Sequence, residues 1–460
     1  MSSSRDNRLP DVLAAPPRMR DKRDLILQDQ KRRTPSRRGR PTKLSVPVRS
    51  DDELLELVQR QTFRYFWDFA HAHSGLARDR SDPKSTEGLD TVVTGGSGFG
   101  VMAIIIAAER KWIQREEAVE RLTKMTSFLL SASSFHGVLP HMLNGVTGKS
   151  FHFTRKDDGG DLVETAYLLT GLLCARQYFD RDEESERGLR WRITQLWEET
   201  EWNWHTRDGM NVLYWHWSPN NGWSMNYEIR GWNECLITYV LAASSPRYPI
   251  EPGVYHKGWV EGVNFKNGRD FYGIELPLGP DYGGPLFFTH YSFLGLDPRG
   301  LKDRYADYWQ QNLAHIRINH AHCVRNPHRF AGYGPTSWGL TASDGPDGYR
   351  PFAPDKDEGV IAPTAALSSM PYTPEYSLAA LRHFYGGLGK RLWREYGFVD
   401  AFCESRDWFA ATHLAIDQGP IIVMIENYRT GLLWKLFMSC SEIGEGLRRL
   451  GFESPHLASS

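Results

Sequence analysis

Apolar side chains recur about every 3.6 residues from position 51 onward, and this period predicts amphipathic helices. In the first of them Asp51 is a plausible N-cap, and the apolar positions run from Leu54 to Phe69. The same pattern predicts further helices along the chain. Together the predicted helices span 51–73, 99–110, 115–132, 161–179, 183–199, 229–243, 301–322, 375–386 and 420–440.

Long connections rich in Gly, Pro and aromatic residues separate these helices. They cover 74–97, 134–160, 200–227, 245–300 and 325–372. Neither strict alternation nor a βαβ rhythm is visible, so we expect an all-α scaffold whose loops hold a few short strands and carry the function. Six helical hairpins of roughly 67 residues each would fill the ordered chain. This estimate favours an (α/α)6 barrel, a toroid of paired helices, although no sequence repeat is evident.

The composition indicates a globular protein with a large core, since 40% of the 460 residues are apolar and 24% are charged. Residues 1–45 differ, because they are rich in Ser, Arg, Lys and Pro and have no helical period. We therefore predict a basic, disordered arm over 1–45 and one folded catalytic domain over 46–460. Over the whole chain 55 Lys and Arg balance 56 Asp and Glu, which argues against a nucleic-acid partner.

Several classes of site and location are excluded by short-range patterns. Five cysteines without a CxxC pair exclude a disulfide framework and a cysteine-based zinc site. The histidines at 315, 320, 322 and 328 have a spacing that fits no helix-face metal site, so we predict no metal and no other cofactor. The glycines at 95–100 resemble a phosphate-binding loop but follow no predicted strand and precede no lysine, which favours a flexible loop.

The longest purely apolar stretch, 101–108, is far too short to span a membrane. The arginine pairs near the start are not followed by an apolar segment, so no export signal is readable. As written, the sequence predicts a cytoplasmic protein; a different start would allow a periplasmic one. The oligomeric state stays open.

The first candidate for chemistry is an acidic cluster at the start of the fourth predicted helix. Asp161 and Glu164 are three residues apart and share one helix face, and Asp157 and Asp158 precede them. Acids in a first turn also favour the helix dipole, which is a structural explanation for them. Glu164 is less easily explained in this way, because it adjoins the apolar run 166–173, where an unpaired carboxylate is costly.

A second candidate is Glu234, which follows Trp232 before an apolar helix. A carboxyl held against an indole ring has its charged form disfavoured and its pKa raised, as a general acid requires. The alternative is an acid that stabilises a helix start, with aromatic packing around it. Aromatic residues make up 13% of the chain, and many of them lie in the loops, where they can line a groove for sugar rings.

A third candidate lies on the last predicted helix. Asp417 is expected to cap or precede this helix, with Pro420 near its first position. Glu426, Asn427 and Arg429 then interrupt an otherwise apolar stretch. They indicate either a lined cavity or an internal ion pair between Glu426 and Arg429.

Five motifs in this order resemble the glucoamylase-like family, typified by the endo-β-1,2-glucanases of glycoside hydrolase family 144; a related domain occurs in cyclic β-1,2-glucan synthases. The resemblance covers about residues 51–450. The motifs are Phe63-Arg-Tyr-Phe-Trp67, Thr94-Gly-Gly-Ser-Gly-Phe-Gly100, the acidic stretch 157–164, Trp232-Asn-Glu-Cys235, and Ile416-Asp-Gln-Gly-Pro420 with Glu426-Asn-Tyr-Arg429.

The resemblance implies one (α/α)6 barrel that hydrolyses linear β-1,2-glucan with inversion, giving sophorose or short sophoro-oligosaccharides. Its acidic cluster corresponds to Asp157, Asp161 and Glu164, and its later cleft glutamate to Glu234. Asp417 resembles a cleft carboxylate that related glucanases place opposite. The alternatives are a transglycosylase of the cyclic-glucan-synthase type and a non-catalytic glycan-binding protein.

Our hypothesis makes Glu234 the general acid and Asp417 the general base. Asp157, Asp161 and Glu164 would bind the sugar at the cleaved bond or supply the base instead. A further set of residues is expected to bind the glucan. These substrate-binding candidates are Trp217, Trp223, Arg230, Trp232, Tyr349, Glu426, Asn427 and Arg429.

Overall fold

Helices dominate the computed structural model, which describes residues 49–457. The arm predicted over 1–45 lies outside the described residues. In the described part the α-helices are α1 (Asp51–Trp67), α2 (Thr94–Glu109), α3 (Arg115–Ser131), α4 (Leu162–Tyr178), α5 (Glu184–Glu198), α6 (Leu236–Ser244), α7 (Tyr308–Arg325), α8 (Pro363–Ser368), α9 (Pro374–Arg382), α10 (Gly389–Leu392), α11 (Ala415–Arg429), α12 (Leu432–Met438) and α13 (Ser441–Leu450).

The strands are short and pair in small antiparallel groups, as the sequence predicted. The longest pair is the hairpin of β7 (Lys266–Phe271) and β8 (Ile274–Leu278), which lies against α7. Two other pairs join distant segments next to the candidate residues Asp161 and Asp417. They are β1 (Arg80–Ser81) with β15 (His413–Leu414), and β5 (Gly160–Asp161) with β6 (His216–Trp217). The remaining strands are β2 (Thr91–Val93), β3 (Met142–Asn144), β4 (Ser150–Phe151), β9 (Ala342–Ser343), β10 (Arg350–Pro351), β11 (Trp393–Arg394), β12 (Gly397–Phe398), β13 (Phe402–Cys403) and β14 (Trp408–Phe409).

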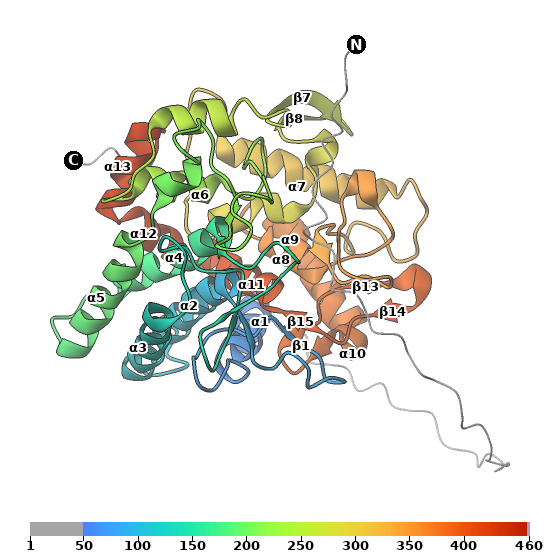
Figure 1. Cartoon of the computed structure of the whole chain (residues 1–460). Coiled ribbons are helices and arrows are strands. Elements are labelled where there is room, and N and C mark those ends of the chain that lie inside the picture. The colour runs from blue at the N-terminus through green and yellow to red at the C-terminus, as the bar shows by residue number, and fades with distance from the viewer. Residues whose placement is uncertain (1–48, 458–460) are drawn as a thin grey trace, which may run out of the picture.

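An inner ring of helices carries the core, and amphipathic helices cover it. The helices α2 and α4 are buried over nearly their whole length, as expected of helices that are apolar on all sides. In the ring α2 packs on α4 and α11, α4 packs on α6, and α11 packs on α8 (Figure 1). The 3-10 turn Tyr291–Leu294 packs against both α6 and α11. Together with α1, α3, α5 and α7 outside it, this ring gives the predicted all-α, (α/α)6 fold.

The glycines of 95–100 form the first turns of α2 and not the flexible loop that we expected. A Cβ atom on Gly98 would lie 2.3 Å from the carbonyl oxygen of Tyr167, and one on Gly171 would lie 2.1 Å from that of Gly98. The two inner helices therefore approach so closely that only glycine fits between their backbones. This contact explains the glycine-rich motif without any phosphate.

Other helix boundaries differ from prediction where local signals compete with packing. The predicted helix 420–440 is two helices, because Gly431 adopts a positive φ of 68° between α11 and α12. The helix predicted from 229 begins only at Leu236. Neither α8 nor α13 was predicted. By contrast, the bounds of α3, α4 and α5 agree with prediction to within one residue at each end.

All five cysteines are buried and unpaired. Among residues 49–457, no helix is long and apolar enough to cross a membrane.

Candidate active site

Contacts between the first turns of the inner helices bring the candidate residues together. The backbone N–H of Gly95 in α2 donates a 2.7 Å hydrogen bond to Oε2 of Glu164 in α4. At the start of α8, Thr364 Oγ1 donates a 2.8 Å hydrogen bond to the carbonyl oxygen of Asp417 in α11. Since helix amino ends carry a partial positive charge, this side of the ring favours carboxylates.

Asp161 is the N-cap of α4, and its carboxylate is fully engaged. Its Oδ1 accepts hydrogen bonds from the backbone N–H groups of Val163 (3.0 Å) and Glu164 (2.9 Å). Its Oδ2 lies 3.3 Å from Nδ1 of His141. Burial alone would raise the pKa of Asp161, but the hydrogen bond and charge of His141 outweigh burial and lower it. Asp161 is therefore ionised at neutral pH.

His141 is a cation beside the acidic cluster. Burial would lower its pKa, but the negative charges of Glu164 and Asp161 outweigh this and raise the pKa to about 10. The imidazole ring also stacks on Phe153, with the ring centroids 4.2 Å apart. In the resulting ion pair, His141 stays protonated and Asp161 stays ionised near neutral pH.

Glu164 is buried and titrates near neutrality. Burial raises its pKa to about 7, the cationic His141 opposes this, and the charge of Asp161 adds to it. The N–H of Gly95 binds only Oε2. This carboxyl can thus exchange a proton in the pH range where an enzyme works.

Glu234 lies two residues before α6, in a turn that is partly exposed. The Ser292 hydroxyl donates a hydrogen bond to its backbone carbonyl and also accepts one from the N–H of Ile237, which fixes this turn. Burial of the carboxyl, together with the charges of Asp161 and Glu164, raises the pKa of Glu234 to about 7. Asp161, Glu164 and Glu234 are called the carboxylate cluster below.

Two buried phenols lie among these acids. The rings of Tyr167 and Tyr291 meet edge to face with centroids 5.6 Å apart. Burial raises the pKa of Tyr291 well above its usual value, and the charges of Asp417, Glu234 and Glu164 add to that effect. Tyr291 thus lies within electrostatic reach of both the carboxylate cluster and Asp417, although these acids come from α4, from α11 and from the turn before α6.

Asp417 forms a second acidic feature together with Asp400, here called the acid pair. Both residues are buried, with exposed fractions of 2% and 1%. Burial raises the pKa of Asp417 strongly, and the charge of Asp400 and a hydrogen bond between the two side chains add to this effect. A buried carboxyl that carries a proton at neutral pH is a poor general base. The raised pKa of Asp417 favours its protonated form and so disfavours the predicted role of general base.

Asp157 pairs with histidine and not with the cluster. His216 Nε2 lies 3.0 Å from its Oδ1 and accepts a 3.2 Å hydrogen bond from the N–H of Gly159. Asp158 accepts hydrogen bonds from Ser218, Asn220 and Asn221. Both aspartates thus hold the 150–160 and 216–222 loops together. The catalytic role predicted for Asp157 is not supported by this geometry.

Aromatic rings extend from the cluster along the β5–β6 pair. Trp217 lies on β6 opposite Gly160, and its ring meets Trp204 edge to face at 5.9 Å. Trp223 packs on the same Trp204 ring at 6.3 Å. Both predicted tryptophans are partly exposed and remain candidates for sugar contacts. Tyr349 is partly exposed too, and the charges of Asp417 and Asp400 add to the burial that raises its pKa.

Trp232 is a core residue, which contradicts the predicted sugar contact. Its ring is buried against Trp259, Phe293 and Tyr308, with the Tyr308 centroid at 5.8 Å. Arg230 is exposed but pairs with Glu228 and donates to the carbonyl oxygens of Lys257 and Gly258. Its side chain is therefore used to hold the neighbouring loop.

Glu426, Asn427 and Arg429, which we predicted to bind substrate, lie at the far end of α11 from Asp417. Nine residues of helix separate Asp417 from Glu426, which is about 13 Å. Their polar atoms are used internally, but not in the Glu426–Arg429 pair that we considered. Glu426 binds Arg110 (2.5 Å) and Gln59 (3.0 Å), Arg429 binds Glu56 and Gln59 (both 2.7 Å), and Asn427 binds the carbonyl of Leu294 (2.9 Å).

Sequence reasoning missed His141, Tyr291 and Asp400. Each lies in a loop or short turn, where no helical period marks it. Their partners lie 17 to 126 residues away: Asp400 pairs with Asp417, His141 pairs with Asp161, and the pKa of Tyr291 responds to the charge of Asp417. Only a conserved polar position in related sequences could have indicated them.

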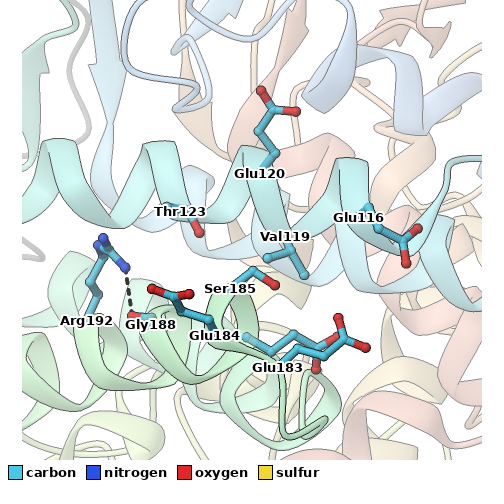
Figure 2. Close-up of a pocket in the computed structure, with 10 residues that line it drawn as sticks. Glu116, Val119, Glu120, Thr123, Glu183, Glu184, Ser185, Gly188 and Arg192 are labelled. Atoms are coloured by element: carbon cyan, nitrogen blue, oxygen red, sulfur yellow. Dashed lines mark hydrogen bonds between the residues drawn. The ribbon is translucent and has the colours of Figure 1, made fainter.

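A groove of about 760 Å³ lies elsewhere, on the outer surface between α3 and α5. Figure 2 shows Glu116 and Glu120 on α3 and Glu183 and Glu184 at the start of α5 along it. None of the predicted site residues lines this groove. It is therefore separate from the carboxylate cluster.

Comparison with known proteins shows that this chain is similar to several characterised proteins and solved structures. Residues 226–441 match a family model described as "Putative glucoamylase". The chain is similar to an endo-β-1,2-glucanase of Chitinophaga pinensis, with 53% identity and a TM-score of 0.87 over 89% of this chain and 100% of that one. It is 60% identical to a putative glucoamylase of Bacteroides uniformis, with a TM-score of 0.88 over 90% and 100% of the two chains.

A curated relative from Parabacteroides distasonis is an exo-β-1,2-glucooligosaccharide sophorohydrolase that acts at the non-reducing end. It is 44% identical over 422 residues, which is 87% of this chain. The chain spans only 58% of the length of that relative.

Proposed function

Because the chain belongs to the glucoamylase-like family, we propose that it hydrolyses β-1,2-linked glucan and releases sophorose or short sophoro-oligosaccharides. The relatives from Chitinophaga pinensis and Parabacteroides distasonis support this substrate class. The observation that carries the mechanism is the presence of two carboxyls, Glu164 and Glu234, whose pKa values are both raised to about 7 in one cluster.

Glu234 acts as the general acid. With a pKa near 7 it keeps a proton at working pH and releases it readily, as an acid catalyst must. Its position in a partly exposed turn gives the glycosidic oxygen access to it, directly or through a sugar hydroxyl. Burial raises the pKa values of the phenols of Tyr167 and Tyr291, and the charge of Glu234 adds to both shifts, so the two phenols lie within electrostatic reach of this carboxyl.

Glu164 acts as the general base in place of Asp417. Its pKa near 7 allows it to take a proton from water, and the N–H of Gly95 fixes its other oxygen. Asp161 is less suited to this step, because both of its oxygens are already bound, one to backbone N–H groups and one to His141. The pair with His141 instead keeps the charge next to Glu164 constant.

The reaction then balances as a single displacement with inversion. Glu234 gives its proton to the glycosidic oxygen while the bond from that oxygen to the anomeric carbon breaks. Water attacks the anomeric carbon from the opposite face and loses a proton to Glu164. Exchange with solvent restores both carboxyls.

The test is incubation with linear β-1,2-glucan, with β-1,3-glucan and starch as comparison substrates. Product sizes are followed by chromatography and the first anomer formed by NMR. We expect sophorose or a short oligomer series from β-1,2-glucan alone, with inverted anomeric configuration. Glu234→Gln should lower kcat by about 10²–10⁴-fold. The matched control is Glu228→Gln, whose carboxyl pairs with Arg230 outside the cluster and should leave kcat within about twofold.

Sophorose alone would indicate exo action, and mixed oligomers would indicate endo action. Longer products formed from added sugar acceptors would show that the protein is a transglycosylase and not a hydrolase. Binding without any products would make the protein a glycan-binding module and overturn the proposal. Normal turnover by Glu234→Gln would remove Glu234 as the acid.

A further inference from the structure

The acid pair, Asp400 and Asp417, has no part in the acid–base step described above, although the charge of Asp417 acts on the same phenol, Tyr291, as the charges of Glu164 and Glu234. Asp400 lies in the connection between β12 and β13, and Asp417 lies in the first turn of α11. Nothing in the sequence pattern joins these residues. Their side chains nevertheless share a hydrogen bond.

The contacts around Asp400 determine which of its oxygens faces Asp417. The backbone N–H of Asp344 donates a 2.6 Å hydrogen bond to Oδ2 of Asp400. Oδ1 of Asp400 and Oδ2 of Asp417 are both buried, and no N–H or hydroxyl group of the described residues donates to either. Two acceptor oxygens that share a hydrogen bond need one proton between them.

The remaining charges around the pair fix its total charge. Arg80 lies 3.3 Å from Oδ1 of Asp344, and Thr412 Oγ1 donates a 2.6 Å hydrogen bond to Oδ2 of the same carboxylate. The groups that face Asp417 are therefore Asp400, Asp344 and Arg80 beside the β1–β15 pair, the phenols of Tyr291 and Tyr349, and Thr364 from α8. One cation serves several carboxyls, so ionisation of both members of the acid pair is disfavoured.

We propose that Asp400 is a positioning residue that shares one proton with Asp417, so that Asp417 meets the sugar as a neutral carboxylic acid and not as a general base. This inference rests on the proposed glucan hydrolysis for its effect on substrate. A neutral acid within electrostatic reach of Tyr291 and Tyr349 can hydrogen-bond a sugar hydroxyl without adding another negative charge to the site. The base role is thereby left to Glu164.

An isosteric substitution separates the two roles of Asp417. Asp417→Asn replaces a neutral acid by a neutral amide of the same shape, so kcat/KM should fall by less than about tenfold, the value of one hydrogen bond. If Asp417 were the general base, the same variant would lose about 10²–10⁴-fold in kcat. Asp347→Asn, at an exposed ion pair with Arg406, is the matched control.

Asp400→Asn tests the positioning role. The N–H of Asp344 requires an oxygen, so the new amide must turn its NH₂ group toward Asp417 and favour the ionised carboxylate. We expect kcat/KM to fall by about ten- to a hundredfold at pH 7 and to recover as the pH is lowered. The double variant Asp400→Asn/Asp417→Asn should recover to the level of Asp417→Asn. A pH profile of Asp400→Asn equal to that of the wild type would overturn the proposal.

Infrared spectroscopy gives a readout that does not depend on activity. At about pH 9 Glu164 and Glu234 are ionised, so a protonated-carboxyl C=O band that persists there should come from the acid pair. We expect this band in the wild type and its loss in both single variants. Absence of the band in the wild type would refute the shared proton. If the wild type does not cleave glucan, the proposed function fails, and the infrared result still decides the acid pair.

Discussion

Glu164 accepts a 2.7 Å hydrogen bond from the backbone N–H of Gly95, and this contact joins the amino ends of α4 and α2. The contact depends on the missing side chain at position 95. A Cβ atom there would lie 2.5 Å from Oε2 of Glu164 and 3.0 Å from Cδ2 of Tyr167. The close packing of α2 against α4 therefore also determines the position of the proposed base.

Gly95→Ala should displace Glu164 while leaving the helix intact, because position 95 has ordinary helical geometry and alanine favours helices. A misplacement of about 1 Å can lower a rate by roughly 10²-fold, so we expect kcat to fall by about ten- to a hundredfold. The measurement is kcat together with the circular dichroism spectrum. Gly334→Ala is the control, since no atom lies within 4 Å of a Cβ there. Unchanged kcat in Gly95→Ala would contradict the role of this contact.

The pH dependence of kcat/KM should be bell-shaped with a maximum near pH 7, because the ionised Glu164 and the protonated Glu234 are both required. The charge of His141 lowers the pKa of Glu164. Removing that charge in His141→Gln should therefore raise the pKa of Glu164 and move the acidic limb to higher pH. An acidic limb that stays in place, or moves to lower pH, would count against Glu164 as the base.

Stability should fall as the pH rises through neutrality. Glu164 and Glu234 have pKa values of about 7 when folded and about 4.3 when unfolded, so between these values the folded state holds more protons than the unfolded state. Each rise in pH over this range then favours unfolding. We expect Tm to decrease from pH 5 to pH 8, and Glu234→Gln and Glu164→Gln to reduce this slope. Variants with a slope as steep as that of the wild type would disagree with the raised pKa values.

Glu426→Gln should destabilise the protein without affecting catalysis. The carboxylate is 1% exposed and pairs with Arg110 at 2.5 Å, and loss of one partner in a buried pair costs about 3–5 kcal/mol. Urea unfolding measures the loss, and kcat of the folded fraction should stay within about twofold. Glu445→Gln, at an exposed position of α13, is the control for the charge change. A fall in kcat without a change in stability would indicate that Glu426 binds substrate, as the sequence predicted.

The sequence predicted the scaffold well where local signals and packing agree. The amphipathic helices α3 and α5 have clear apolar stripes and were placed to within a residue. The start of α2 was missed because glycine normally disfavours a helix, and here the close approach to α4 outweighs that preference. Gly431 divided a helix in two, since its positive φ cannot occur inside a helix.

The site was only partly predictable for a related reason. Asp161 and Glu164 are close in sequence, so helix geometry alone places them together. Glu234 and Asp417 were candidates from their local patterns and from the family resemblance, but their electrostatic effect on Tyr291 appears only in the fold. Trp232 and Arg429 are residue types that often bind sugars. In the fold, however, the Trp232 ring lies in the core and the Arg429 guanidinium pairs with Glu56.

The amino-acid order by itself determined that this chain forms buried and amphipathic helices, with acids at the first turns of two inner ones, because these properties depend on residues a few positions apart. The tertiary structure alone decided the protonation of those acids. A carboxyl's pKa depends on burial and on charges within a few ångströms, and for Asp417 the decisive neighbour, Asp400, comes from another loop of the barrel.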